Sequence, residues 1–118
     1  MIRRQEPGTV SLVGAGPGDP GLLTLKGLKR LEDADVVIHD HLVSAAILSF
    51  IPNRAERVYV GKWAGESLKT QEEIGDLLVN YAQRNLRVVR LKGGDVFLFG
   101  RGGEECSRLK EACISYEI

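Results

Sequence analysis

Short apolar runs rich in valine alternate along the chain with longer segments of helical periodicity. Such runs, bounded by polar and turn residues, are typical of β-strands. They predict four strands, at residues 9–13, 35–39, 57–60 and 87–91. A fifth strand is predicted to begin at Ile114. The strand at 35–39 is apolar through its centre, so we expect it to be covered on both faces of the sheet.

The segments between these runs predict helices. Leucines at near-helical spacing predict an amphipathic helix over residues 22–31, and residues 44–50 predict a short helix that stops before Pro52. The leucines of the first helix are Leu22, Leu23, Leu25, Leu28 and Leu31. Thr70 with Glu73 three residues later resembles a capping signal, which predicts a helix to about Gln83. A last helix is predicted over residues 104–112.

Strands that alternate with helices of these lengths predict an α/β fold with an open, mostly parallel sheet and helices on both faces. We expect residues 1–7 to be disordered. The chain ends at Ile118, inside or directly after a strand, whereas a complete α/β domain usually covers its last strand. We therefore expect the chain to be the front half of a longer protein.

Composition excludes several classes of protein. A length of 118 residues suits one domain, and 16 basic against 16 acidic residues argue against a general nucleic-acid binder. No stretch reaches the ~20 apolar residues that span a bilayer, and no secretory signal is present, so we expect a cytoplasmic protein. Cys106 and Cys113 lack metal-site spacing and are expected to be reduced thiols.

The glycines are informative about function, because the 14 of them are clustered along the chain. One cluster, with two prolines, spans residues 14–21 after the first strand, and another spans residues 93–103 after the fourth. Ligands of open parallel sheets bind beyond the carboxyl ends of the strands, and glycine lets the backbone approach them closely. Both clusters therefore predict a single ligand site.

Two common nucleotide motifs fit these clusters poorly. The first cluster begins like the dinucleotide fingerprint G-x-G-x-x-G, but Asp19 replaces its last glycine and the prolines stiffen the turn. Asp40, at the end of the second strand, could still act as the acid that binds a ribose. A phosphate-binding P-loop fails more clearly, because Trp63 and not Ser or Thr follows Lys62.

Four blocks of sequence resemble the tetrapyrrole methyltransferases, which use S-adenosylmethionine. They are GAGPGDPGLLTLK at residues 14–26, DHLVS at 40–44, GKWAG at 61–65 and VVRLKGGDVFLFGRGGEE at 88–105. The last block is similar to the uroporphyrinogen-III C-methyltransferases, a group that includes the methylase part of siroheme synthases. The resemblance extends over residues 8–118.

The resemblance implies a longer enzyme of two α/β domains that holds the cofactor between them and acts as a homodimer. Such an enzyme methylates two pyrrole carbons of uroporphyrinogen III and gives precorrin-2, on the route to siroheme and cobalamin. Residues 1–118 would be its amino-terminal domain, and the carboxy-terminal domain would be absent. We expect the chain alone to be nearly inactive, with an exposed domain interface that favours self-association.

The resemblance also assigns roles to individual residues. It places S-adenosylmethionine against Pro17, Gly93, Gly94, Asp95 and Leu98. It makes Asp40 the proton acceptor and Lys62 the proton donor. Methylation of a pyrrole carbon requires loss of a ring proton, which a carboxylate can accept, and needs no metal. Asp40 could instead only begin a turn, Asp95 could cap a loop, and Lys62 could pair with a substrate carboxylate.

A substrate with many carboxylates favours a basic site. Lys92 and Arg101 lie at or after the end of the fourth strand and are candidates to bind it. Arg101 could instead pair with Glu104 or Glu105, which would brace the loop.

The chain departs from the family pattern at three positions. His41 stands where an arginine is common, and it is charged only at lower pH, but we keep it as a substrate-binding candidate. His39 and His41 together are too few ligands to indicate a metal site. Val96 replaces a proline, which adds a backbone N–H. Trp63 replaces a common arginine, either as a flat wall for the substrate or as a packed side chain.

Two other interpretations stay open. One is a related methylase that acts on another corrin precursor, on ribosomal RNA or on diphthine, although residues 92–105 argue against it. The other is a non-catalytic remnant or binding module, which the short length, His41 and Val96 favour.

Overall fold

The computed structural model describes residues 2–16, 21, 23–40, 43–61, 70–93 and 102–118. In chain order its elements are β1 (Val10–Gly14), α1 (Leu25–Asp33), β2 (Val36–His39), α2 (Ala45–Leu48), β3 (Glu56–Tyr59), α3 (Gln71–Gln83), β4 (Val88–Lys92), α4 (Gly102–Glu111) and β5 (Tyr116–Glu117). The strands form one sheet in the order β3-β2-β4-β1-β5, and every neighbouring pair is parallel. The predicted parallel α/β fold is therefore confirmed.

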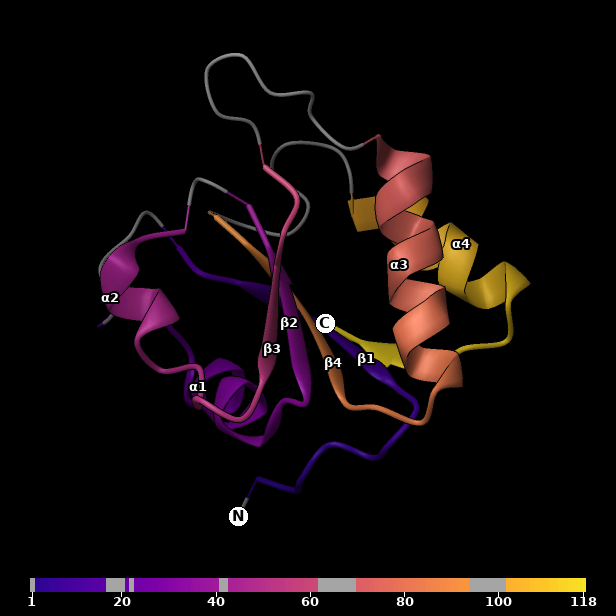
Figure 1. The fold of residues 1–118 in the computed structure, drawn as a ribbon. Helices are drawn as coiled ribbons and strands as arrows, with labels where there is room; N and C mark the ends of the chain where they lie inside the picture. Colours follow the sequence, from indigo (N-terminus) through magenta and orange to yellow (C-terminus); the bar gives the residue numbers. More distant parts are fainter. Residues whose placement is uncertain (1, 17–20, 22, 41–42, 62–69, 94–101) are drawn as a thin grey trace.

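The helices cover both faces of the sheet (Figure 1). Helices α1 and α2 pack on one face, and α3 and α4 pack on the other. Strand β2 shows how one strand serves both cores, because Val37 contacts the first pair of helices while Val36 and Ile38 contact the second. All three are fully buried, which confirms that this strand is covered on both sides.

The first helix begins later than predicted. It starts at Leu25, because the Thr24 side chain accepts a hydrogen bond from the Gly27 N–H at 2.9 Å and so acts as the N-cap. Leu25 itself is 77% exposed and does not join the apolar face on which it was predicted. Leu22, the predicted first residue, lies outside the described part of the chain.

The segment before β1 is fixed to the sheet by Gln5. This residue is buried, and its amide donates hydrogen bonds to the carbonyls of Thr9 at 2.9 Å and Val88 at 3.0 Å. The Arg87 guanidinium donates to the Gln5 carbonyl at 2.7 Å. We predicted disorder for residues 1–7, whereas residues 2–7 lie along the amino end of the sheet in the structure.

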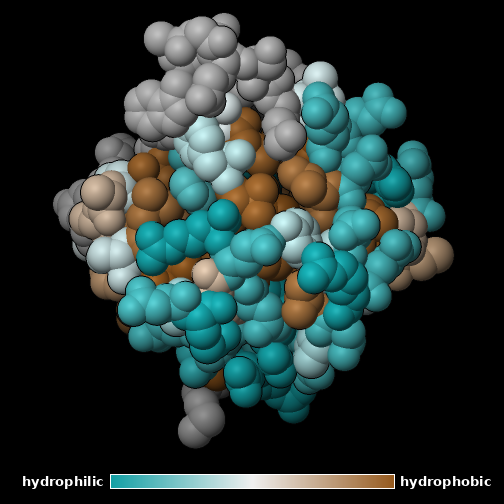
Figure 2. All heavy atoms as spheres, in the orientation of Figure 1, coloured by the Kyte–Doolittle hydropathy of each residue, from teal (hydrophilic) through white to brown (hydrophobic). Residues whose placement is uncertain are grey.

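Strand β3 forms one edge of the sheet and is only partly buried. Figure 2 shows apolar atoms near the middle of this side of the molecule, with hydrophilic residues below and to the right of them. Two charged residues, Glu56 and Arg57, begin the strand. Charges on an edge strand disfavour pairing with another sheet.

Both cysteines are free, as predicted; Cys106 is buried and Cys113 is exposed. Among the described residues, no helix has the length and apolar content that crossing a membrane requires.

Strand β5 is tied to α1 through the carboxylate of Glu117. This group accepts hydrogen bonds from Ser11 Oγ at 2.7 Å and from the Arg30 guanidinium, and Lys26 Nζ lies at 3.0 Å. Burial alone would raise the pKa of Glu117, but the hydrogen bonds from Arg30, Ser11 and Lys26 outweigh it and lower the pKa to about 2.

A complete capping box begins α3, as the sequence predicts. Thr70 Oγ1 accepts from the Glu73 N–H, and the Glu73 carboxylate accepts from the Thr70 N–H, both at 3.1 Å. We expect Thr70→Ala to lower the free energy of unfolding by about 1 kcal/mol, because the Glu73 N–H in the first turn of the helix loses its partner. Urea denaturation measures this, with Thr70→Ser as the control that keeps the cap. Equal stability of the alanine and serine variants would contradict it.

A second prediction concerns pH. The folded-state pKa of Glu117, about 2, lies below its ordinary value of 4.5. The contribution of Glu117 to stability is therefore present above pH 4.5 and is lost as the pH falls toward 2. We expect Glu117→Gln to lose less stability over this interval than the parent chain, measured by urea denaturation at a series of pH values. Glu111→Gln, on the exposed end of α4, should keep the parent's pH dependence.

Candidate functional site

The carboxyl ends of four neighbouring strands lie side by side along one edge of the sheet, which we call the carboxyl edge. Its described residues are Gly14, Ala15, Gly16, Asp40, Gly61, Lys92 and Gly93. The parallel register pairs Gly14 of β1 with Lys92 of β4, and it pairs His39 of β2 with Tyr59 of β3. Every candidate site residue of the described chain lies on this edge.

The two glycine clusters begin next to one another. The Ala15 N–H donates to the Lys92 carbonyl at 2.7 Å, so the β1–β4 pairing continues past the end of β1. Gly16 has a φ of 70°, a conformation that residues with a Cβ rarely adopt, and Gly93 is buried. Adjacent strands lie about 5 Å apart, so the described starts of both clusters can contact the same small ligand.

Asp40 occupies the next strand end along the edge. It follows β2 directly and is half-buried. Because β4 lies between β2 and β1, the backbone of Asp40 is two strand spacings, about 10 Å, from the first glycine cluster. The preceding His39 is buried against Tyr59, with ring centroids 5.6 Å apart. This places a carboxylate within reach of a ligand that extends across several strand ends.

A buried network of charges lies directly beneath this edge. Arg90 Nε donates to Glu105 Oε1, and Lys92 Nζ donates to Glu105 Oε2, both at 2.7 Å. The Glu105 side chain is completely buried, and only 3% of the Arg90 side chain is exposed. Arg90 also donates to the carbonyl of Leu91 at 3.2 Å. We call Arg90, Lys92 and Glu105 the charge triad.

The triad bears on two predictions. Lys92 was predicted to bind substrate, but its side chain is only 10% exposed and its ammonium bonds to Glu105. Direct contact with a ligand carboxylate would require it to leave that partner. Glu105 was considered as a partner for Arg101, whereas its two oxygens bond to Arg90 and Lys92. Sequence reasoning missed the triad; its signal is two basic residues on one face of an otherwise apolar strand.

The other predicted site residues lie outside the described part of the chain. They are Pro17, His41, Lys62, Gly94, Asp95, Leu98 and Arg101. The departures Trp63 and Val96 also lie there. In the sequence, the predicted proton donor Lys62 directly follows Gly61, the last described residue after β3. The predicted roles of all these residues stay predictions.

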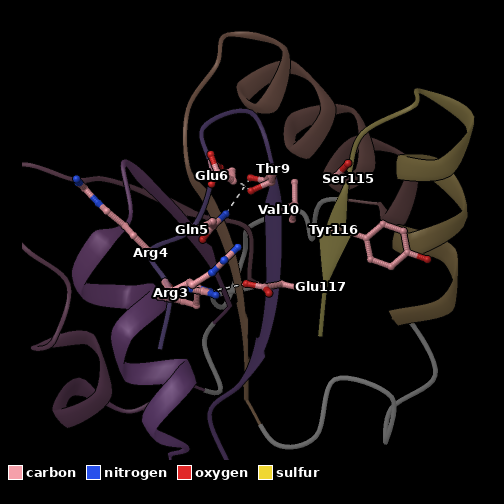
Figure 3. A pocket seen from close by; sticks show the side chains of 10 residues that line it. Arg3, Arg4, Gln5, Glu6, Thr9, Val10, Ser115, Tyr116 and Glu117 are labelled. Atoms are coloured by element: carbon pink, nitrogen blue, oxygen red, sulfur yellow. Dashed lines mark hydrogen bonds and ion pairs between the residues drawn. The ribbon is translucent and has the colours of Figure 1, made fainter. Parts of the chain in front are cut away.

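A pocket of about 270 Å³ lies at the opposite end of the sheet (Figure 3). It is lined by the segment before β1, by Thr9 and Val10 at the start of β1, and by β5. Arg30 and Glu117 in its wall bond to each other. None of the predicted site residues lines it, so the pocket is separate from the carboxyl edge. Across the residues that the structure describes, no three His, Cys, Asp or Glu side chains are grouped so that they could hold a metal ion.

Comparison with known proteins gives consistent results for this chain. The family model described as Tetrapyrrole (Corrin/Porphyrin) Methylases matches residues 9–118. Siroheme synthase 2 of Cronobacter sakazakii is 57% identical over 111 residues, which are 94% of this chain and 24% of that protein. Siroheme synthase of Actinobacillus pleuropneumoniae serotype 3 is 58% identical over 111 residues, 94% of this chain and 23% of that protein. The chain thus spans about a quarter of the length of these relatives.

Solved structures agree with this match. A uroporphyrin-III C-methyltransferase from Thermus thermophilus superposes with a TM-score of 0.81 and 45% identity, over 92% of this chain and 45% of that one. The Thermus enzyme complexed with S-adenyl homocysteine gives a TM-score of 0.80 and 49% identity, over 93% of this chain and 46% of that one. A cobalt precorrin-4 methyltransferase gives a TM-score of 0.81 and 34% identity, over 94% and 44%. The chain belongs to the tetrapyrrole methylase family.

Proposed function

We propose that this chain is the amino-terminal domain of an S-adenosylmethionine-dependent methyltransferase that converts uroporphyrinogen III to precorrin-2. The carboxyl edge carries the proposal: the described starts of the two glycine clusters lie on adjacent strands, and Asp40 lies at the next strand end. The similarity to siroheme synthases at 57% and 58% identity supports this substrate and favours the route to siroheme.

The glycine clusters suit a nucleoside cofactor. Gly16 and Gly93 have no Cβ atom, so a ligand can approach the backbone closely at two adjacent strand ends. S-adenosylmethionine would lie against them and against Pro17, Gly94, Asp95 and Leu98. When bound, it supplies a methyl group on a sulfonium, and the protein need only align the acceptor carbon and exclude water. The relative solved with S-adenyl homocysteine supports this choice of cofactor.

The two neighbouring strand ends would handle the proton and the substrate. Asp40 would accept the ring proton that methylation releases. Lys62, which follows β3, would donate a proton or pair with a substrate carboxylate. His41 and Arg101 would add positive charge near the carboxylates of the substrate. Lys92 would stay bonded to Glu105 and attract these carboxylates electrostatically, without direct contact.

We further propose that turnover requires more than these residues. The chain spans about a quarter of the curated relatives and less than half of the Thermus enzyme. The rest of the cofactor site would come from a carboxy-terminal domain, and the whole enzyme would act as a homodimer. The isolated chain would then bind cofactor without turning over substrate.

Cofactor binding by the isolated chain is the first test. We expect saturable, one-to-one binding of S-adenosylhomocysteine in a calorimetric titration up to millimolar concentration, because both glycine clusters begin on the paired strands β1 and β4. Lack of binding, both by the chain and by a chimera in which it replaces the matching region of the Cronobacter siroheme synthase, would contradict the proposed function.

The same chimera tests Asp40. We expect Asp40→Asn to slow methylation of uroporphyrinogen III by about 100-fold or more, because a general base is lost, while the affinity for S-adenosylhomocysteine is unchanged. Single-turnover assays measure the rate. Asp76→Asn, an exposed aspartate of α3, is the matched control and should keep full activity. Unchanged turnover of the Asp40 variant would remove its role as base, and a folded chimera that binds cofactor but methylates nothing would favour a non-catalytic remnant.

A further inference from the structure

We infer that Glu105 is a positioning residue for the cofactor site, which it holds in place through Lys92 and Arg90. The inference rests on the proposed function, since the cofactor is expected to contact Gly93, which directly follows Lys92. Glu105 does not reach the carboxyl edge itself. Its two bonds to β4 hold the end of that strand against the first turns of α4.

The position of the triad in the sequence is the first argument. Lys92 is the last residue of β4 and directly precedes the second glycine cluster, and α4 begins at Gly102. Glu105 is the fourth residue of that helix. The triad therefore joins the strand that enters residues 94–101 to the helix that leaves them. A strand end and a helix start that are held together lose less conformational freedom when a ligand binds beside them, which favours affinity.

Lys92 extends this connection to the first cluster. Its ammonium bonds to Glu105 and its carbonyl accepts from the Ala15 N–H, both at 2.7 Å. One residue thus links α4, β4 and the start of residues 14–21. A displacement of Lys92 would move the starting points of both glycine clusters relative to each other.

Burial makes this arrangement specific. The Glu105 side chain is fully buried, and the side chains of Arg90 and Lys92 are 3% and 10% exposed. A buried charge without its partner is strongly unfavourable, so arrangements that leave one of the three groups unpaired are disfavoured. Apolar replacements of buried ion networks often leave stability equal or higher, so stability alone is a poor reason for one here. Fixing the geometry beneath a ligand site is the better reason.

The test uses Glu105→Gln in the 118-residue chain. Glutamine keeps the shape but has one acceptor oxygen where the carboxylate had two, and it carries no charge. Amide hydrogen exchange should become about tenfold faster or more in residues 88–93 and 102–108, and stay the same in α1. The dissociation constant for S-adenosylhomocysteine should rise about tenfold or more, because binding must then restore the position of β4, at a cost comparable to one hydrogen bond to a charged group.

Three further variants separate positioning from general stability. Glu111→Gln removes an exposed charge from the same helix and should change neither readout. Val10→Ala removes buried apolar contact at the amino end of β1, and should lower stability without weakening cofactor affinity. Lys92→Met removes one arm of the triad and should act like Glu105→Gln with a smaller effect, which provides a second test if the glutamine variant does not fold.

The outcomes are distinct. Faster exchange confined to residues 88–93 and 102–108, with affinity lost in the triad variants alone, supports the inference. If Glu105→Gln and Lys92→Met change exchange and affinity no more than Val10→Ala at equal loss of stability, Glu105 is merely structural and the inference is overturned. Should the parent chain bind no cofactor, the affinities are measured in the chimera, where lack of binding contradicts the proposed function, and exchange in the 118-residue chain still decides whether Glu105 fixes the two segments.

Discussion

Strand β4 lies between β1 and β2, and its backbone hydrogen bonds set the positions of both neighbours. All five of its residues are buried, with helices on both sides. Because side chains alternate between faces, a shift of β4 by one residue would turn Val88 and Val89 toward the wrong cores. The same shift would separate Lys92 from Gly14 and from Asp40. One register therefore fixes the fold and the spacing of the candidate site together.

Such a strand would be expected to carry only apolar side chains, yet Arg90 and Lys92 stand on one of its faces. They are tolerated because α4 returns across the sheet and brings Glu105 between them. These buried charges lie at the end of β4 that reaches the carboxyl edge. The fold and the candidate site therefore depend on the same residue, because Lys92 ends the central strand and directly precedes the glycines expected to bind a ligand.

Local patterns predicted most of the elements but few of the contacts between them. The α3 capping box lies within four residues, so the sequence shows it directly. The start of α1 was misplaced because leucines on both sides of Thr24 continue the helical spacing. The anchoring of Gln5 and the charge triad could not be predicted, since Gln5 meets Val88 and Glu105 meets Arg90 only after the chain has folded back. The cofactor and proton-transfer residues came from family resemblance, and the structure describes Asp40 and Gly93 among them; Lys92 was predicted from its charge and its place at a strand end.

The strand order also has a consequence for how the chain folds during synthesis. Strands β2 and β3 are neighbours in sequence and in space, so they can pair as soon as both have left the ribosome. Strand β1 is made first, but its partners begin only at Val88 and Tyr116, so it waits unpaired while most of the chain is translated. Until β4 inserts, two apolar strands present open edges to other chains. The nascent protein should therefore depend on chaperones most strongly between the emergence of β3 and that of β4.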